Sequence, residues 1–299
     1  MSVTQKRKKE FAAKFLQSVF SSLGFADVGS GGKLKNPWNL LPESKMRKFD
    51  FEPMEGSAEQ LPLCISNATG KRDFYVAKDE RSSSLHEPSS EFAERFNQPT
   101  LRTLKTIPVQ VTTLDEYFQG RYDEIDLIDI NAEGHDFQVL EGASQLLESW
   151  VKLIKVEFEL TQVWHGQGWF GDIDGLLRSK GYELADIDVA FWRPAKAAHI
   201  FHKGEPLWGK AFYVPGAAKI QSFAGRSPQD FQDAVFKSVI LYALVNIPGR
   251  AFDVLDLTGK NAALDSLRSG IDWVFQYARW DNAMEKLAHI ARFPMRLLK

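Results

Sequence analysis

The sequence predicts an α/β protein with a mostly parallel β-sheet, helices on both faces of that sheet, and an all-helical C-terminal extension. Three observations lead to this prediction. Short apolar runs alternate with helical stretches between residues 24 and 216, a glycine-rich turn follows the first run, and the chain after Pro215 is helical throughout. Such alternation is typical of parallel strands joined by helices. We divide the chain into residues 1–23, 24–216 and 217–299.

Residues 1–23 are expected to form a basic amphipathic helix. A basic run at residues 6–9 precedes apolar residues at helical spacing, including Phe11 and Phe15. Lys14 and Gln17 interrupt the apolar stretch and no cleavage site follows, which argues against a signal peptide. Two interpretations remain: a helix packed on the domain, or an anchor at a membrane surface.

Within residues 24–216, strands are expected wherever a short apolar run is bounded by turn residues. Residues 136–149 carry the clearest helical stripe, and residues 78–98, rich in Ser, Glu and Arg, indicate a surface excursion beside the sheet. The expected strands cover residues 25–28, 48–51, 61–66, 125–130, 153–160, 182–191 and 211–214, and shorter helices cover 113–117 and 172–179.

The extension at residues 217–299 reads as an array of helices. One begins at Ser227-Pro228, Pro248-Gly249 interrupts it, and further helices cover residues 262–278 and 282–291. This array could serve as a lid, as the interface of a homo-oligomer or as a docking arm for a partner.

Composition excludes several classes of partner and site. The net charge is −2, from 37 basic and 39 acidic residues, so no strong field favours a nucleic acid. The single cysteine, Cys64, allows no intrachain disulfide, which fits a cytoplasmic protein. The most apolar stretch of the extension, residues 234–247, is too short for a transmembrane segment and contains Lys237.

A ligand site is predicted at the turn 27–32, which contains Asp27, Gly29, Ser30 and Gly31. Closely spaced glycines after a strand let the backbone approach a ligand at the carboxyl edge of a sheet. The turn has neither the Lys-Ser/Thr of a P-loop nor the full dinucleotide fingerprint. Glu52 ends the next strand about twenty residues further on, where a carboxylate can accept both hydroxyls of a ribose. Together these features predict nucleoside binding.

The chain also resembles the FkbM-type methyltransferases, in about two thirds of its length and in the order of that family's motifs. The resemblance implies a class I methyltransferase (Rossmann-like) sheet in residues 24–216 that binds S-adenosyl-L-methionine (SAM). It places Gly29 and Gly31 near the methionine part, Glu52 at the ribose, and Ser66 or Asn67 near the adenine, with Asp27 and Ser30 in the same cofactor turn. The matching segments are 27–32, 51–53, 65–70, 82–85, 111–115, 125–128, 133–134, 139–143, 156–159, 176–177 and 181–182.

The fourth strand departs from the family pattern. Where the family usually has Lys and Asp, this chain has Asp129 and Asn131. The change leaves open a catalytically impaired methyltransferase-fold protein that acts as a binding or scaffold subunit. A nucleotide-sugar or NAD enzyme is a further alternative, which the short glycine turn disfavours.

Strand periodicity suggests another arrangement of polar groups. Asp129 and Asn131 share one face and Glu133 follows, while Glu157 and Glu159 share a face in the next strand. If the strands are neighbours, these oxygens converge at the carboxyl edge, where they share a proton, pair with Lys or Arg, or bind a hard cation.

Three residues are candidates for the base that takes the acceptor's proton: His135, Asp129 and Glu133, in that order. His135 could instead be a polar residue of the first helical turn. His165 lies on a loop with Trp164 and Trp169, whose rings could stack on a sugar or anchor the helical extension. No metal ligands are assigned, because His199 and His202 lack a carboxylate pattern. The resemblance implies O-methylation of a hydroxyl on a sugar, a glycan or a secondary metabolite, with a small-molecule or glycan acceptor.

Overall fold

The computed structural model describes residues 2–19, 21–29, 31, 34–54, 61–258 and 262–276. Its contacts divide the chain into two compact units, each built from separate stretches of sequence. We call them the helical unit (Met1–Ser22, Lys35–Lys45 and Ser227–Lys299) and the sheet unit (Leu23–Leu34 and Met46–Arg226).

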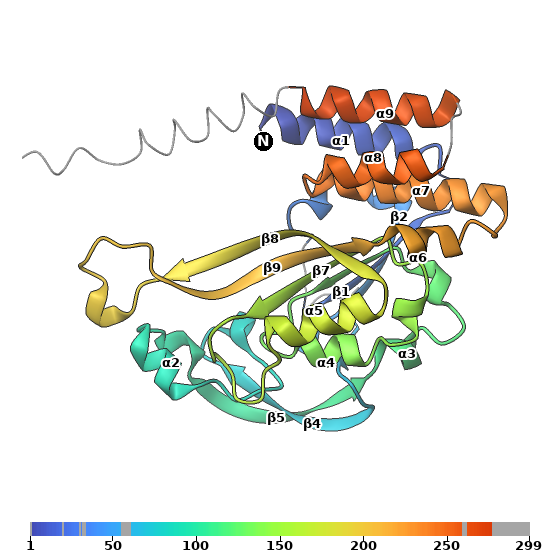
Figure 1. Cartoon of the computed structure of the whole chain (residues 1–299). Coiled ribbons are helices and arrows are strands. Elements are labelled where there is room, and N and C mark those ends of the chain that lie inside the picture. The colour runs from blue at the N-terminus through green and yellow to red at the C-terminus, as the bar shows by residue number, and fades with distance from the viewer. Residues whose placement is uncertain are drawn as a thin grey trace, which may run out of the picture. The chain divides into compact units, whose positions relative to one another are not determined.

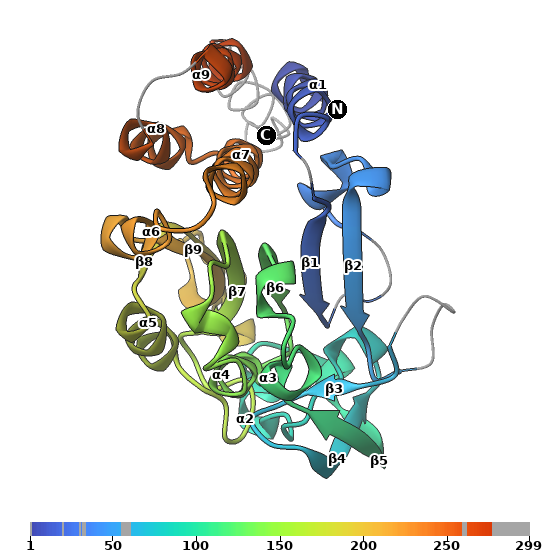
Figure 2. The ribbon, with the colours of Figure 1, turned by 90° about the vertical axis from the view of Figure 1, so that its right-hand side faces the viewer.

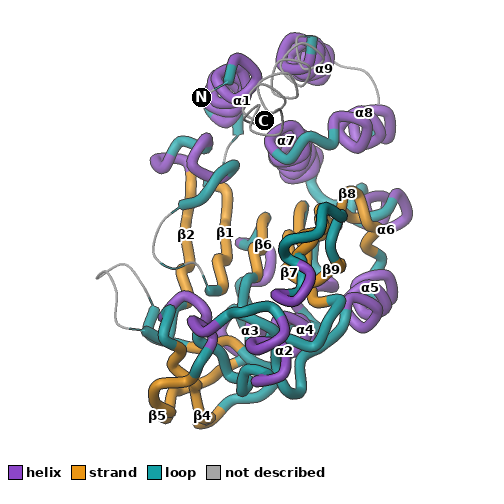
Figure 3. Tube along the Cα trace, turned by 90° about the vertical axis from the view of Figure 1, so that its left-hand side faces the viewer, coloured by secondary structure: helices purple, strands orange, loops and turns teal. Residues whose placement is uncertain are grey.

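The sheet unit is built on a six-stranded sheet of order β2-β1-β6-β7-β9-β8 (Figure 1). The first four of these strands are parallel, and β9 is antiparallel to both β7 and β8. Figure 3, turned by 90° from the view of Figure 1, shows the same strand order. The predicted α/β fold with a mostly parallel sheet is therefore confirmed. The strands are β1 (Leu23–Val28), β2 (Met46–Phe51), β6 (Leu127–Ile130), β7 (Leu153–Glu159), β8 (Tyr182–Trp192) and β9 (Glu205–Pro215).

The two faces of this sheet differ in chemistry because side chains alternate along each strand. Val28, Ile130 and Val156 belong to one apolar core with residues of helices α4 (Asp136–Glu141) and α5 (Phe170–Ser179). The alternate positions are polar and in register across the four parallel strands: Asp50, Asp27, Asp129 and Lys155. One face thus supplies the core, and the other carries a row of charges.

A second, three-stranded sheet has the order β3-β5-β4. It lies beyond the carboxyl ends of β1 and β2 (Figure 2). The strands are β3 (Cys64–Ile65), β4 (Gly70–Ala77) and β5 (Thr103–Thr112). We predicted β3, but β4 and β5 were missed because half of their residues are exposed and Pro108 lies within β5. Pro108 is tolerated because β3 pairs with β5 only at Val111 and Thr112.

The predicted helix at 136–149 is wrong in its length, because α4 ends at Glu141. Gly142 approaches another backbone closely, since an added Cβ would lie 2.1 Å from the Ser66 carbonyl oxygen. The Asp115 carboxylate then accepts hydrogen bonds from the Gln145 and Leu146 amides, both at 2.8 Å. Side-chain acceptors of this kind compete with helical hydrogen bonding, and only a short 3-10 turn follows at Leu146–Glu148.

The excursion at residues 78–98 and the remaining short helices complete the sheet unit. The excursion includes all of α2, whose first turn is capped by the Ser89 hydroxyl. Both α3 and α6 are single short helices next to strands in the sequence. Their bounds are α2 (Ser90–Arg95), α3 (Leu114–Tyr117) and α6 (Ala217–Ser222).

The helical unit contains α1, α7, α8 and α9, so the predicted helices of the C-terminal extension are present. Phe11 and Phe15 of α1 are buried, and α1 packs against α7 and α9. The predicted helix at 282–291 lies outside the described residues. No helix in the described part of the chain is long and apolar enough to cross a membrane. The bounds are α1 (Val3–Leu16), α7 (Pro228–Leu244), α8 (Pro248–Leu257) and α9 (Ala262–Phe275).

Candidate functional site

The glycine turn is fixed between the ends of β2 and β6. Gly29 has φ = 76°, and its amide donates a hydrogen bond of 3.0 Å to the Phe51 carbonyl. A Cβ at Gly29 would lie 2.0 Å from the Asn131 carbonyl oxygen. Only glycine combines this conformation with this close approach.

The structure brings Glu52 to the same turn. The Gly31 amide donates a hydrogen bond of 3.2 Å to a Glu52 carboxylate oxygen. Gly31 has φ = 61°, and apart from its chain neighbours no atom of the described residues lies within 4 Å of the place where its Cβ would be. The open space above Gly31 beside a strand-end carboxylate fits a nucleoside with ribose hydroxyls at Glu52. Ser30 lies outside the described residues.

Ser66 and Asn67, predicted on the adenine side, have different surroundings. Ser66 is fully buried, and its hydroxyl lies 2.9 Å from Nε2 of His135. Asn67 is exposed; its amide donates to Glu141 at 3.0 Å, and its oxygen accepts from Arg72 at 2.9 Å.

His135 is a buried member of a short hydrogen-bonded chain. One ring nitrogen of His135, Nε2, contacts the Ser66 hydroxyl. The other, Nδ1, lies 3.0 Å from Nε2 of His86. Burial lowers the pKa of His135 to about 3, and the charges of His86 and Arg72 add to this effect. At neutral pH its ring is therefore uncharged.

Asp129 is paired with a lysine on the neighbouring strand. The Lys155 ammonium lies 2.8 and 2.7 Å from the two Asp129 oxygens, and both side chains are largely buried. At the directly paired position on β1, burial raises the pKa of Asp27 to about 8, and the charges of Asp129 and Asp50 contribute. The negative charge of Asp129 is thus compensated by a cation from β7.

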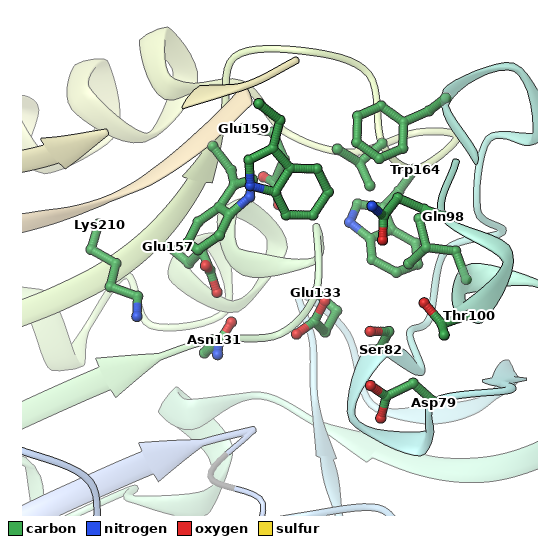
Figure 4. Close-up of a pocket in the computed structure, with 15 residues that line it drawn as sticks. Asp79, Ser82, Gln98, Thr100, Asn131, Glu133, Glu157, Glu159, Trp164 and Lys210 are labelled. Carbon is green, nitrogen blue, oxygen red and sulfur yellow. The ribbon is translucent and has the colours of Figure 1, made fainter. Parts of the chain in front are cut away.

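A pocket of about 370 Å³ opens at the carboxyl edge of the sheet (Figure 4). Asn131 and Glu133, just after β6, line it together with Glu157 and Glu159 of β7. The predicted convergence of these four side chains is therefore present. Asp129 does not line the pocket.

Aromatic and basic side chains form another part of the pocket wall. Trp164 comes from the loop after β7, Trp192 from the end of β8, and Trp208 and Lys210 from β9. Trp164 is 2% exposed, and Lys210 Nζ lies 5.8 Å from the centre of the Trp208 ring. We expected an aromatic role for the loop but did not predict the residues from β8 and β9.

The excursion predicted at residues 78–98 also reaches the pocket. Asp79, Ser82 and Gln98 of the excursion line the pocket, and so does Thr100, which follows the excursion in the sequence (Figure 4). Ser82 lies in the matching segment 82–85, but Asp79, Gln98 and Thr100 carry no sequence motif, so only the fold reveals their position at the pocket. A polar rim from the excursion therefore faces the carboxylates at the sheet edge.

The two carboxyl groups of β7 titrate unusually. Burial, reinforced by Asp136, raises the pKa of Glu157 to about 7, although Lys210 and Lys155 oppose the rise. Burial and the charges of Asp136, Glu157 and Glu133 raise the pKa of Glu159 well above its usual range. In the described part of the chain, no three His, Cys, Asp or Glu side chains are placed to hold a metal ion.

Glu133 is held in an unusual backbone conformation. Its φ is 51°, and its carbonyl accepts a hydrogen bond of 2.7 Å from the Ser84 hydroxyl. The next residue, Gly134, lies so close to Trp164 that a Cβ would be 2.2 Å from the indole. The Asp136 carboxylate accepts from the Gly134 amide at 3.1 Å. The turn is thus constrained on several sides, as strained residues at functional sites often are.

Comparison with known proteins identifies one family. Residues 36–184 match the methyltransferase FkbM domain, a stretch that includes Glu52, Glu133 and both carboxylates of β7. No curated protein matches the chain. Among solved structures, magnesium protoporphyrin IX methyltransferase from Synechocystis PCC 6803, with bound SAM, matches at 14% identity, covering 71% of this chain and 79% of that chain. Its TM-score of 0.33 is too low to establish a shared fold. The chain belongs to the methyltransferase FkbM domain family, as a methyltransferase that uses SAM.

Proposed function

We propose that this enzyme transfers the methyl group of SAM to a hydroxyl group of a sugar, a glycan or a secondary metabolite. The observation that carries the proposal is the position of Asn131. Its backbone amide donates to the Val28 carbonyl at 2.9 Å, its carbonyl faces Gly29, and its side chain lines the pocket. An acceptor in the pocket would therefore lie next to the cofactor turn.

The pocket wall suits a polyhydroxylated acceptor. Carboxyl and amide oxygens accept hydrogen bonds from hydroxyl groups, and indole rings stack on the apolar face of a sugar. The Asn131 side-chain oxygen is buried and has no hydrogen-bond partner among the described residues. A hydroxyl of the acceptor would satisfy it.

Among the three candidate bases, we propose Glu133. It lines the pocket, whereas Asp129 is paired with Lys155 and His135 is buried between Ser66 and His86. SAM, when bound, supplies an electrophilic methyl group. Glu133 would accept the proton of the acceptor hydroxyl as its oxygen forms the new bond to carbon, while Asn131 holds the acceptor in place.

The test is a Glu133→Gln variant assayed with methyl-labelled SAM against a panel of sugars, glycans and hydroxylated metabolites. Loss of a general base predicts a fall in kcat of about 10² to 10⁴-fold, with unchanged affinity for SAM in calorimetry. Glu148→Gln, which changes an exposed carboxylate bonded to Lys180 at 2.7 Å, is the matched control. An unaltered kcat in Glu133→Gln would exclude this residue as the base.

The alternative of a binding or scaffold subunit predicts a different outcome. Such a protein would transfer no methyl group to any member of the panel, even where a thermal-shift measurement shows SAM binding. The Asp129–Lys155 pair argues for the enzyme, because it compensates the charge that Asp129 introduces.

A further inference from the structure

The pocket has an excess of carboxyl groups. Asp79, Glu133, Glu157 and Glu159 line it; Asp79 is paired with Arg81 at 2.8 Å, and Lys210 is the one basic side chain among the described lining residues. A neutral acceptor would leave this imbalance unchanged, while an anionic acceptor would increase it. The charge of the pocket therefore favours a cationic ligand group.

Lys210 does not serve all of these carboxyl groups. In the β7–β9 register it is opposite Glu157, while Glu159 is opposite Trp208. Figure 4 shows Lys210 on the side of Glu157 and Asn131, away from Trp164. Lys210 thus lies opposite Glu157, with its Nζ 5.8 Å from the centre of the Trp208 ring, while the residue opposite Glu159 is not basic.

Glu159 is the carboxyl group with the strongest need for a partner. It is 4% exposed, and no hydrogen bond or ion pair links its carboxylate to another described residue. An uncompensated charge at such a position is costly, so the group needs a proton or a cation. The indoles of Trp164 and Trp208 line the same pocket, and indole faces attract ammonium groups.

We propose that the methyl acceptor carries a protonated or quaternary amine, as an amino sugar or an amino alcohol does, held by Glu159 and the indoles of Trp164 and Trp208. This inference rests on the proposed function and specifies its substrate class. It also fits transfer to oxygen, because an ammonium group bound to a carboxylate has no free electron pair to take a methyl group. The hydroxyl at Glu133 would then be the nucleophile.

Two matched pairs of probes test the charge alone. Choline and 3,3-dimethyl-1-butanol have nearly the same shape, and glucosamine and glucose differ at one substituent. Binding to the full-length protein, saturated with S-adenosylhomocysteine, is measured by tryptophan fluorescence and calorimetry at pH 7.5 and constant ionic strength. We expect each cationic member to bind about tenfold more tightly than its neutral counterpart.

Variants locate this preference. Glu159→Gln should abolish the preference for the cationic probe. Trp208→Leu should weaken the binding of choline more than that of its neutral counterpart. Glu148→Gln, outside the pocket, should leave both affinities unchanged. Melting temperatures of the variants verify folding. Equal binding of the two members, binding of neither, or a preference that survives Glu159→Gln would overturn the inference.

The same preparations separate this inference from the proposed function. If the protein binds SAM and methylates neutral sugars without a charge preference, the methyltransferase proposal stands and the amine site is refuted. If the charge preference is found but no hydroxyl is methylated, the amine site stands and the proposed reaction is refuted.

Discussion

The ammonium of Lys155 lies 2.8 and 2.7 Å from the two carboxylate oxygens of Asp129, across neighbouring parallel strands. The register pairs Asp129 directly with Lys155. The negative charge on β6 is therefore matched by a cation on the neighbouring strand β7.

Lys155→Met should destabilise the protein by about 3 to 5 kcal/mol, because it leaves Asp129 buried without this cation. Urea unfolding measures the loss. Arg178→Met is the control, since its ion pair with Asp174 is more exposed and should contribute less than about 1 kcal/mol. Exchanging the two residues, Asp129→Lys with Lys155→Asp, should restore most of the stability. A loss for Lys155→Met no greater than that of the control would contradict a structural role.

The two described glycines of the cofactor turn should respond differently to alanine. Gly29→Ala places a Cβ 2.0 Å from the Asn131 carbonyl oxygen and should cost about 3 kcal/mol or more in unfolding free energy. In Gly31→Ala the added Cβ meets no atom of the described residues within 4 Å beyond its chain neighbours, so the variant should cost about 1 to 2 kcal/mol, from its φ of 61°. Gly31→Ala should nevertheless weaken the binding of SAM, because the alanine side chain enters the space assigned to the cofactor. Unchanged SAM affinity in Gly31→Ala would place the cofactor elsewhere.

Glu52→Gln should lower the affinity for SAM about tenfold or more, since hydrogen bonds to a charged acceptor contribute about 1.5 to 3 kcal/mol. The Gly31 amide can still donate to the glutamine oxygen, so the turn should keep its conformation. Calorimetry with SAM and with S-adenosylhomocysteine measures the change, and Glu148→Gln serves as the control. Equal affinities for wild type and variant would refute the assignment of Glu52 to the ribose.

Stability should fall as the pH rises from about 4.5 to 7, partly through Glu157. Its pKa is about 7 in the folded protein against an ordinary 4.5, so the folded state holds a proton that the unfolded state has released. This contribution is complete below pH 4.5 and is lost as the pH passes 7, amounting to about 3 kcal/mol. Asp136, with a pKa of about 7, acts in the same direction. Glu157→Gln should therefore show a smaller fall in unfolding free energy over this interval, and an unchanged fall would refute the assignment.

The parallel strands β1, β6 and β7 were predictable because they are mostly buried apolar runs with clear boundaries. Each of the seven runs expected to be strands overlaps one, whereas half of the residues of β4 and β5 are exposed, so these strands lack a continuous apolar run. The length of α4 was not predictable, since it depends on Asp115, which is distant in sequence and captures two backbone amides.

The candidate site likewise has a part that was predictable from the sequence and a part that was not. Period-two alternation placed Glu157 and Glu159 on one face, and the structure brings them to Asn131 and Glu133. Extending that alternation back by two residues leads to Lys155, a signal that we did not use. Pairing it with Asp129 still required the strand register, which a single sequence does not reveal. The residues from β8, β9 and the excursion depend wholly on tertiary structure.

The connection between β1 and β2 has a consequence for how the molecule can be dissected. Residues 35–45 belong to the helical unit, yet the cofactor turn precedes them, and β2, which leads to Glu52, follows them. Trp38, Leu40 and Leu41 in this connection are almost fully buried. Cutting the chain after Arg226 would therefore not release a self-sufficient catalytic fragment. It would remove most of the unit to which this connection belongs and turn the link between Gly29 and Glu52 into a slack loop with a higher entropy of closure.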